Sequence, residues 1–304
     1  MIKNLVFEGG GIKGIAYSGA IRFMEKSGLL SSLEKIAGTS AGAIIAGLLA
    51  LGYTSKEIFD IMAETSFESF KDDDFGIVRD IHRLINEFGL YKGDAFLKWF
   101  QELIERKVGY GDLTFGALHN YSEGLEHYKD LYVVATDLSS GKELVLSHET
   151  YPDMQIAHAV RMSMSIPGFF RCVKMDLEGD GKANIIVDGG LTCNYPIHIF
   201  DGQPGTYGFK LDTKDEIVHQ GIHGIGTFDN DKAGDNVIQF FLACFNHAMA
   251  QANKKHLSGK HFCQTCFIDT LDIGTVDFDL SKEDSKRLSD SGFSATEKFF
   301  YSIL

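Results

Sequence analysis

The apolar positions near the start of the chain follow a strand–loop–helix order that occurs twice. A short apolar run at residues 5–7 precedes a glycine-rich loop, and apolar positions at helical spacing then fill residues 15–26. A second short run at residues 35–37 leads through a glycine and a serine into the nearly all-apolar segment 41–51. A helix that is apolar on all sides must be buried, so this pattern predicts a βαβ unit in a parallel sheet.

The rest of the pattern is mixed. Between residues 55 and 128 apolar positions recur at helical spacing, which predicts a helical insertion that forms either ordinary core or a lid. Strands are expected at residues 131–135, 142–147, 169–177, 184–187, 207–211 and 262–269, and helices at 153–164, 236–256 and 282–301. The expected architecture is one domain over residues 1–304, an α/β fold of three layers (α/β/α) around a mostly parallel sheet.

The charge balance excludes one class of partner. The chain of 304 residues has a formal net charge of −13, with 44% hydrophobic and 23% charged residues. Nucleic-acid binding needs concentrated Lys and Arg, so nucleic acid is not an expected partner. The longest apolar stretch, residues 41–53, is shorter than the ~20 residues that span a bilayer. We therefore expect a soluble protein that contacts membranes only peripherally.

The cysteines and the amino terminus favour a reducing compartment. Five cysteines, an odd number without regular spacing, are typical of free thiols rather than of a disulfide framework. The first residues lead directly into the first predicted strand and lack the basic and apolar regions of a secretory signal. A cytoplasmic location is the expectation, and secretion as an effector is the alternative. Oligomeric state is not indicated.

A serine lies at the turn between the second predicted strand and its helix. Gly38, Ser40 and Gly42 form G-x-S-x-G in the strand–turn–helix context of a nucleophile elbow. Small flanking residues let strand and helix approach closely, and the helix N-terminus stabilises negative charge beside the serine. The alternative is a turn that only links the two elements. The position of the motif favours Ser40 as a nucleophile.

A glycine-rich loop precedes the first predicted helix. Residues 9–14 read Gly-Gly-Gly-Ile-Lys-Gly and fit G-x-G-x-x-G, the fingerprint of a dinucleotide-binding loop. That fingerprint also requires an acidic residue at the end of the next strand, whereas this strand ends at Ser40 and has Glu34 at its start. We therefore expect the loop N–H groups to bind the oxyanion of a tetrahedral intermediate, with a phosphate-binding turn or plain packing as the alternatives. The expected donors are Gly10 and Gly11, together with Gly9.

An Asp-Gly-Gly turn at residues 188–190 follows the strand predicted at residues 184–187. Functional residues of open α/β sheets gather beyond the carboxyl ends of strands, where Ser40 also lies. Such a turn alone is usually structural. Together with the serine and glycine motifs it indicates Asp188 as a base that accepts the serine proton. The residues expected to support these loops are Lys13, Gly14, Gly38, Gly42, Gly189 and Gly190.

These three motifs together resemble the patatin-like phospholipase family. The resemblance rests on residues 9–14, 38–42 and 188–190, which occur in this order. It continues through residues 160–168, Val-Arg-Met-Ser-Met-Ser-Ile-Pro-Gly, and the Asn-Tyr-Pro at 194–196. It spans most of residues 4–200 and thins beyond them.

The resemblance implies both a patatin-like serine hydrolase fold and its chemistry. By carry-over, Ser40 is the nucleophile and Asp188 the general base of a dyad without a catalytic histidine. The family hydrolyses acyl esters of phospholipids, lysophospholipids and glycerolipids without a metal or other cofactor at the site. The implied partner is an acyl-lipid substrate, reached by transient contact with membranes. An acyltransferase using the same acyl-enzyme, an inactive lipid-binding protein and a nucleotide-binding module using residues 9–14 remain alternatives.

Histidines provide a competing base. His198, His247 and His256 follow Asp188, so the order Ser–Asp–His is available, but none of them lies in a recognisable motif. The family pattern needs no histidine, and we expect none to be catalytic.

Two patterns resemble metal sites. Cys263 and Cys266 form a single C-x-x-C, which is weak evidence for zinc and is better explained by a buried strand that uses small apolar thiols. Acidic residues at 176–180 are similar to an EF-hand loop, but Val187 stands where the bidentate Glu belongs. A turn between two strands is the expected structure there, and no metal site is expected.

Overall fold

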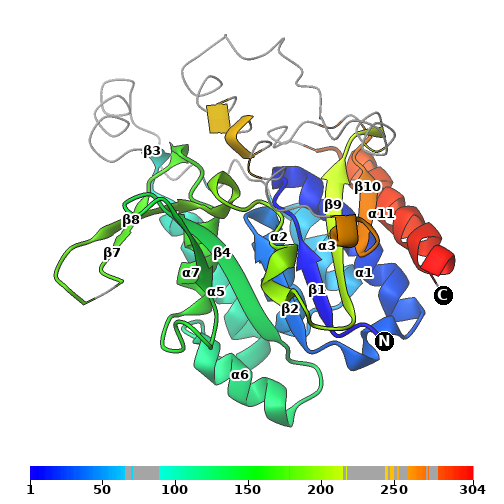
Figure 1. Cartoon of the computed structure of the whole chain (residues 1–304), viewed down its shortest axis with the longest axis horizontal. Helices are drawn as coiled ribbons and strands as arrows, with labels where there is room; N and C mark the ends of the chain where they lie inside the picture. The colour runs from blue at the N-terminus through cyan, green and yellow to red at the C-terminus, as the bar shows by residue number, and fades with distance from the viewer. Residues whose placement is uncertain are drawn as a thin grey trace.

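One large sheet organises the chain, as the computed structural model shows (Figure 1). The structure describes residues 1–65, 70, 89–177, 179–214, 259–271 and 280–303, together with a few positions between 217 and 273. Most of the helix predicted at 236–256 and part of the insertion predicted at 55–128 therefore lie outside the described residues. The statements below concern the described part.

The strand order of the large sheet is β10-β9-β1-β2-β4-β8-β7, and β5 pairs with β4 off this path. Strands β10, β9, β1, β2 and β4 are parallel to one another, whereas β5, β8 and β7 are joined by antiparallel pairing. The bounds of these strands are β1 Asn4–Phe7, β2 Lys35–Thr39, β4 Asp130–Asp137, β5 Lys142–Leu146, β7 Val173–Met175, β8 Asn184–Asp188, β9 Thr206–Asp212 and β10 Thr265–Asp269. A second, parallel pair consists of β3 Gly89–Tyr91 and β6 Gly168–Phe170.

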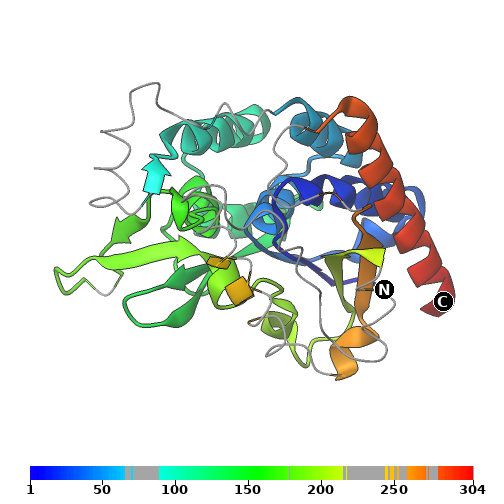
Figure 2. The ribbon, with the colours of Figure 1, turned by 90° about the horizontal axis from the view of Figure 1, so that it is seen from above.

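Helices gather on one face of this sheet, and Figure 2 shows α1, α3, α5 and α11 together on that side. The helices are α1 Ala16–Lys26, α2 Ala41–Ala50, α3 Ser55–Glu64, α5 Asp94–Val108, α6 Phe115–Gly124, α7 Ile156–Ser163, α10 Gly259–Phe262 and α11 Lys282–Ile303. Short 3-10 turns occupy Gly11–Ile15, Leu29–Ser32, Gly189–Leu191 and Ile197–Phe200. The mostly parallel central sheet with its flanking helices confirms the predicted α/β/α fold.

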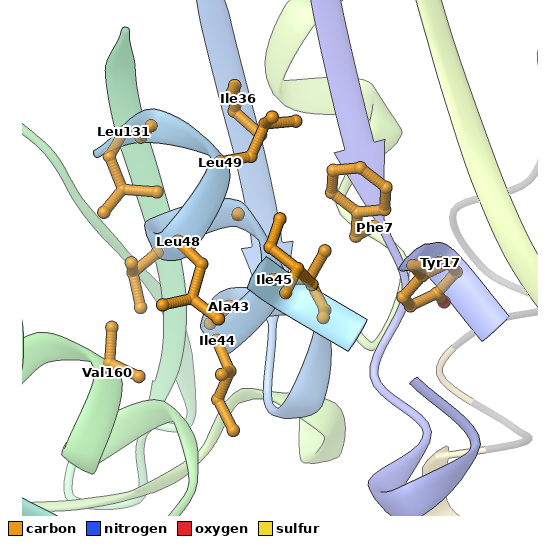
Figure 3. Close-up of a cluster of buried hydrophobic side chains, with 14 of the residues drawn as sticks. Phe7, Tyr17, Ile36, Ala43, Ile44, Ile45, Leu48, Leu49, Leu131 and Val160 are labelled. Atoms are coloured by element: carbon orange, nitrogen blue, oxygen red, sulfur yellow. The ribbon is translucent and has the colours of Figure 1, made fainter. Parts of the chain in front are cut away.

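Side-chain alternation along β1 divides the core in two. Leu5 and Phe7 belong to the large cluster under the helices, while Val6 belongs to a small cluster on the opposite face. Helix α2 lies inside the large cluster, between the strands and α7, and all ten of its residues are buried (Figure 3). Its position explains why segment 41–51 has no polar face. The small cluster is covered by the turn Ile197–Phe200.

Several predicted boundaries are wrong. The segment predicted as one strand at 169–177 is divided between β6 and β7, which belong to different sheets, and β3 is a strand within the predicted helical insertion. The strand predicted from residue 262 begins at Thr265, so Cys266 is buried in β10 but Cys263 is exposed in a turn before it. The acidic segment after β7 does form a turn, in which the Asp176 carboxylate accepts the N–H groups of Gly179, Asp180 and Gly181.

Candidate active site

Ser40 stands between the end of β2 and the start of α2 with backbone angles that a side-chain-bearing residue rarely adopts. Its φ is 54° and its ψ is −126°. Such a conformation costs on the order of 1–3 kcal/mol and persists only where its surroundings hold it. The glycines on either side allow it: a Cβ on Gly38 would lie 2.2 Å from the Gly42 oxygen, and one on Gly42 would lie 2.3 Å from the Phe7 oxygen. The turn therefore has the geometry of a nucleophile elbow.

A second serine fixes the backbone of this turn. The Ser40 N–H donates to Ser163 Oγ at 2.8 Å, and Ser163 Oγ donates to the Val134 carbonyl of β4 at 2.6 Å. The Ser40 hydroxyl itself points toward Met164 Sδ at 3.6 Å, a weak acceptor. Ser40 is 5% exposed. The hydroxyl is thus held near the surface of the core, close enough to the Asp188 carboxyl to lower the pKa of that group.

Asp188 lies beside the Ser40 turn, at the end of a strand that runs in the opposite direction to β2. It ends β8, but β8 runs antiparallel to β4, with Asp188 paired to Ala135 just beyond the end of β2. A Cβ on the following Gly189 would lie 2.3 Å from the Val134 oxygen and 2.9 Å from Thr39 Cγ2. Asp188 therefore does follow a strand, as expected, but its strand points back toward β2 instead of running beside it.

The two oxygens of the Asp188 carboxyl have different environments. Oδ1 accepts the Gly190 N–H at 2.8 Å. Oδ2 is buried and accepts no hydrogen bond from the described residues. Complete burial raises the pKa of Asp188 to about 7, against the opposing effects of the Gly190 N–H and the nearby Ser40 hydroxyl. A carboxyl with one unused oxygen and a pKa near neutrality is suited to accept a proton.

The glycine loop after β1 lies beside the serine. A Cβ on Gly9 would lie 3.0 Å from Ser40 Cβ, so the loop backbone passes directly over this residue. The Gly9 N–H donates to the Asn194 carbonyl at 3.0 Å and is therefore occupied. Within the described residues the N–H groups of Gly10 and Gly11 have no acceptor, and Gly11 has a left-handed φ of 58°. Of the three expected donors, these two are available.

The supporting residues lie in the same layer. Gly14 packs against the start of α2, where its Cβ would lie 3.3 Å from Ala41 Cβ, and Lys13 is half-buried in the turn Gly11–Ile15. A Cβ on Gly190 would lie 2.6 Å from Met249 Sδ. At Gly14 and Gly190 a side chain would press against these neighbours, which explains why both positions are glycine.

Asn194 joins the two loops, a role that sequence reasoning missed. Its side-chain Nδ2 donates to the Gly9 carbonyl at 2.9 Å and to Glu8 Oε1 at 3.3 Å. The backbone carbonyl of Asn194 accepts the Gly9 N–H. Beneath the loop, the buried Glu8 carboxylate pairs with Lys210 Nζ and accepts the Leu211 N–H at 2.9 Å. The Asn-Tyr-Pro resemblance marked Asn194, but nothing local in the sequence indicated these partners.

Arg161 was also missed as a positioning residue. Its guanidinium is almost completely buried and donates to the carbonyls of Lys92, Gly93 and Arg171 and to Ser165 Oγ. The Ser165 carbonyl in turn accepts the Asp188 N–H at 3.0 Å. Arg161 thereby ties the segment that contacts both Ser40 and Asp188 to the small sheet of β3 and β6.

A family model for patatin-like phospholipases matches residues 5–201, which include the glycine loop, Ser40 and Asp188. The chain belongs to the patatin-like phospholipase family. YqhO, an uncharacterized protein of Bacillus subtilis, is 32% identical, with 97% of this chain and 96% of YqhO aligned. The probable lipid hydrolase 463L of Invertebrate iridescent virus 6 is 30% identical over 65% of this chain and 62% of its own length.

The patatin-like fold is also shared with a solved structure. VipD from Legionella pneumophila superposes with a TM-score of 0.64 at 18% identity, covering 99% of this chain and 67% of VipD. Identity this low shows the fold alone.

Other sequence candidates lie elsewhere in this patatin-like chain. The ring nitrogens of His198 face Cys193 Sγ at 3.8 Å and Glu143 Oε1 at 3.3 Å, and His256 lies outside the described residues. A cavity of about 370 Å³ lies between α1, α3 and α11 and is lined by neither Ser40 nor Asp188. No helix in the described part of the chain combines the length and apolar character needed to cross a membrane.

Proposed function

We propose that this protein is a lipid acyl hydrolase of the phospholipase A or lysophospholipase type. The observation that carries the proposal is the pairing of a strained, helix-capping Ser40 with the unused, buried Oδ2 of Asp188. Family membership and a relative named as a probable lipid hydrolase support an acyl-lipid substrate. Docking on a membrane would be transient and peripheral, and a cytoplasmic location is the working expectation.

In the proposed reaction Ser40 Oγ attacks the ester carbonyl while Asp188 Oδ2 takes its proton. The N–H groups of Gly10 and Gly11, together with the positive N-terminus of α2, stabilise the oxyanion. Collapse of the tetrahedral intermediate returns the proton from Asp188 to the departing alcohol and leaves an acyl-serine. Asp188 then activates water, which releases the fatty acid and restores the serine.

Release of fatty acid from defined lipids tests the proposal. We expect the purified protein to hydrolyse phospholipid vesicles, lysophospholipid micelles or a triacylglycerol emulsion. Accumulation of acylated alcohol in place of free acid would indicate the acyltransferase alternative. Absence of turnover and transfer across all three substrates, in a protein that is folded, would contradict the proposal.

The pH dependence of the reaction follows from the Asp188 pKa. Burial raises this pKa to about 7, and the base acts only when it is deprotonated. The value of kcat/KM should therefore rise with pH through about 7 and level off above it. Initial rates on a soluble ester with a non-titrating chromophore measure this profile. A profile that levels off near pH 4, as for an ordinary carboxyl, would contradict the assignment.

Replacement of Ser163 tests how the elbow is held. Ser163→Ala removes the acceptor of the Ser40 N–H and the donor to Val134. We expect kcat to fall about tenfold or more, because small displacements of a nucleophile cost up to roughly 10²-fold, while KM changes little. Leaving these buried groups unpaired should also lower the free energy of unfolding by about 1–3 kcal/mol.

Ser289→Ala is the matched control, since Ser289 is also a buried, hydrogen-bonded serine but lies on α11, where its hydroxyl accepts from Ser18 Oγ at 2.9 Å. We expect a similar loss of stability with a much smaller change in kcat. Equal losses of kcat in the two variants would mean that Ser163 acts only through general stability.

A further inference from the structure

The cavity between α1, α3 and α11 is separate from the candidate active site. Helices α1 and α11 approach backbone to backbone at two glycines: a Cβ on Gly19 would overlap the Ser289 carbonyl oxygen, and one on Gly292 would overlap that of Ala16. Helix α3 packs mainly against α1. The three helices, which Figure 2 shows on one side of the sheet, therefore border a cavity of about 370 Å³. This volume falls in the lower part of the range of about 300–1,000 Å³ for small-molecule sites.

Part of the cavity lining is apolar. Phe59 and Ala63 lie one turn apart on α3, and both are half-buried and line the cavity. They also pack against the large hydrophobic core. The buried serines Ser18 and Ser289 line the cavity as well, and their hydroxyls are hydrogen-bonded to each other at 2.9 Å. A hydrocarbon group suits this lining, because it removes the apolar surface from water and needs no hydrogen bond.

The exposed side of the cavity has an excess of positive charge. Lys282 and Lys286 lie one turn apart at the start of α11, and both line the cavity. In the described part of the chain neither lysine has a carboxylate within ion-pair distance. Of the two carboxylates in the lining, Asp60 is paired with Lys56 at 2.7 Å, which leaves Glu64 alone against the two lysines. A local positive excess attracts anions, even though the chain as a whole has a net charge of −13.

Arg22 adds a buried donor to the same lining. Its Nη2 pairs with Asp290 Oδ1 at 2.8 Å, and its guanidinium carbon lies 4.8 Å from the centre of the Phe293 ring. Its Nε is buried and has no acceptor among the described residues. Buried donors are nearly always hydrogen-bonded in folded proteins, and an unpaired one lowers stability. An anionic oxygen that enters the cavity supplies the acceptor that Nε lacks.

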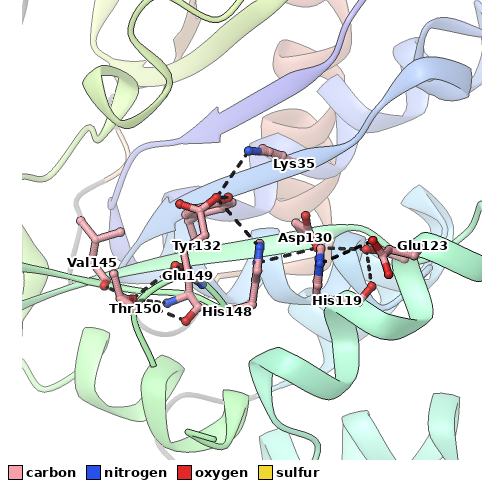
Figure 4. Close-up of polar contacts among 11 residues, drawn as sticks. Lys35, His119, Glu123, Asp130, Tyr132, Val145, His148, Glu149 and Thr150 are labelled. Atoms are coloured by element: carbon pink, nitrogen blue, oxygen red, sulfur yellow. Dashed lines mark hydrogen bonds and ion pairs between the residues drawn. The ribbon is translucent and has the colours of Figure 1, made fainter. Parts of the chain in front are cut away.

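Another cluster of charged side chains, at the start of β4, does not have this property (Figure 4). Asp130 Oδ1 is bonded by His119 Nδ1 and by Ser122 Oγ, each at 2.9 Å. Lys35 lies 3.6 Å from Glu149. The charges of that cluster are therefore paired within the protein, whereas Lys282 and Lys286 remain available to a ligand.

We propose that the cavity between α1, α3 and α11 binds an anionic amphiphile with a single hydrocarbon chain. The chain lies against Phe59 and Ala63. The head group, a carboxylate or a phosphate monoester, lies between Lys282, Lys286 and Arg22. A free fatty acid and a single-chain lipid phosphate share this chemistry. Ser40 has no part in the binding, so the proposal goes beyond the hydrolytic function and does not depend on it.

Calorimetric titration of decanoate and of decyl phosphate into the full chain, each below its micelle concentration, tests the proposal. Neither compound contains an acyl ester, so binding is measured without turnover. We expect saturable binding at one site, and tighter binding of decanoate or of decyl phosphate identifies the fatty acid or the lipid phosphate as the natural ligand. Inorganic phosphate and decyltrimethylammonium should bind far more weakly, because one lacks the chain and the other has the opposite charge. Equal binding of either control, or no saturable binding of both anions, would overturn the proposal.

Charge reversal locates the bound amphiphile. Lys282→Glu combined with Lys286→Glu should weaken binding about tenfold or more, because each exposed charge pair contributes up to several-fold to affinity. Lys182→Glu combined with Lys298→Glu is the matched control: it changes the net charge equally at exposed positions outside the cavity lining and should bind as the wild type does. Ala63→Trp should also weaken binding, because the indole occupies the space of the chain. Unchanged affinity in the Lys282→Glu, Lys286→Glu variant would place the ligand elsewhere and overturn the proposal.

Discussion

Ser40→Ala is expected to abolish lipid hydrolysis and to leave the fold unchanged. Alanine keeps the Cβ and so adopts the same strained backbone at φ 54°, held by the same Ser163 contact. The contacts that disappear are a 3.6 Å approach to Met164 sulfur, a weak acceptor, and the interaction of the hydroxyl with the Asp188 carboxyl. Removal of a serine nucleophile that acts together with its base costs on the order of 10⁶-fold in kcat. The activity should therefore fall to background.

The measurement is fatty-acid release, with circular dichroism and a thermal melt to establish that the variant is folded. Ser40→Cys is a useful companion, because a thiol keeps a nucleophile in place and should retain a small fraction of activity on activated esters. Substantial hydrolysis by Ser40→Ala would mean that another group attacks the substrate.

Asp188→Asn is expected to have the second largest effect. The amide preserves the shape of the carboxyl and its acceptance of the Gly190 N–H, but it cannot take a proton from Ser40. We expect a loss of about 10³–10⁴-fold in kcat, comparable to the loss of a correctly oriented base in other serine hydrolases. Near-normal rates would instead mean that a group other than Asp188 takes the Ser40 proton.

The stability of Asp188→Asn separates catalysis from folding. The folded-state pKa of Asp188 is raised from 3.8 to about 7, so its contribution to stability is present below pH 4 and is lost as the pH rises through 7. Asparagine does not titrate and avoids burying a charge. Thermal midpoints should therefore show the variant gaining on the wild type between pH 4 and pH 8. A variant whose thermal midpoint falls relative to that of the wild type between pH 4 and pH 8 would contradict the burial argument.

The sequence predicts the site best where chemistry and periodicity coincide. Strand β2, the turn at Ser40 and helix α2 were all predictable, because an all-apolar helix after a G-x-S-x-G turn has few alternative structures. The glycine loop was predictable because it lies between a short apolar strand and a helix with regular apolar spacing. Availability of its N–H groups was not, since the Gly9 N–H is occupied by Asn194, which lies far along the chain.

Long-range pairing accounts for what the sequence did not predict. The direction of β8 depends on its register with β4, and the three apolar residues before Asp188 suit either direction. Strand β3 has three residues and pairs with β6, so its local pattern is too short to distinguish it from helix. Contacts of Ser163 and Arg161 likewise depend on partners that only the fold brings near.

Covalent labelling with a fluorophosphonate in the presence of phospholipid vesicles tests the central claim most directly. The reagent reacts with an activated serine, and peptide mapping identifies the residue that carries the adduct. We predict one adduct, at Ser40, which is absent in Ser40→Ala and forms far more slowly in Asp188→Asn. An adduct at another residue, equal labelling of Ser40→Ala, or a folded wild type that is not labelled would contradict the account.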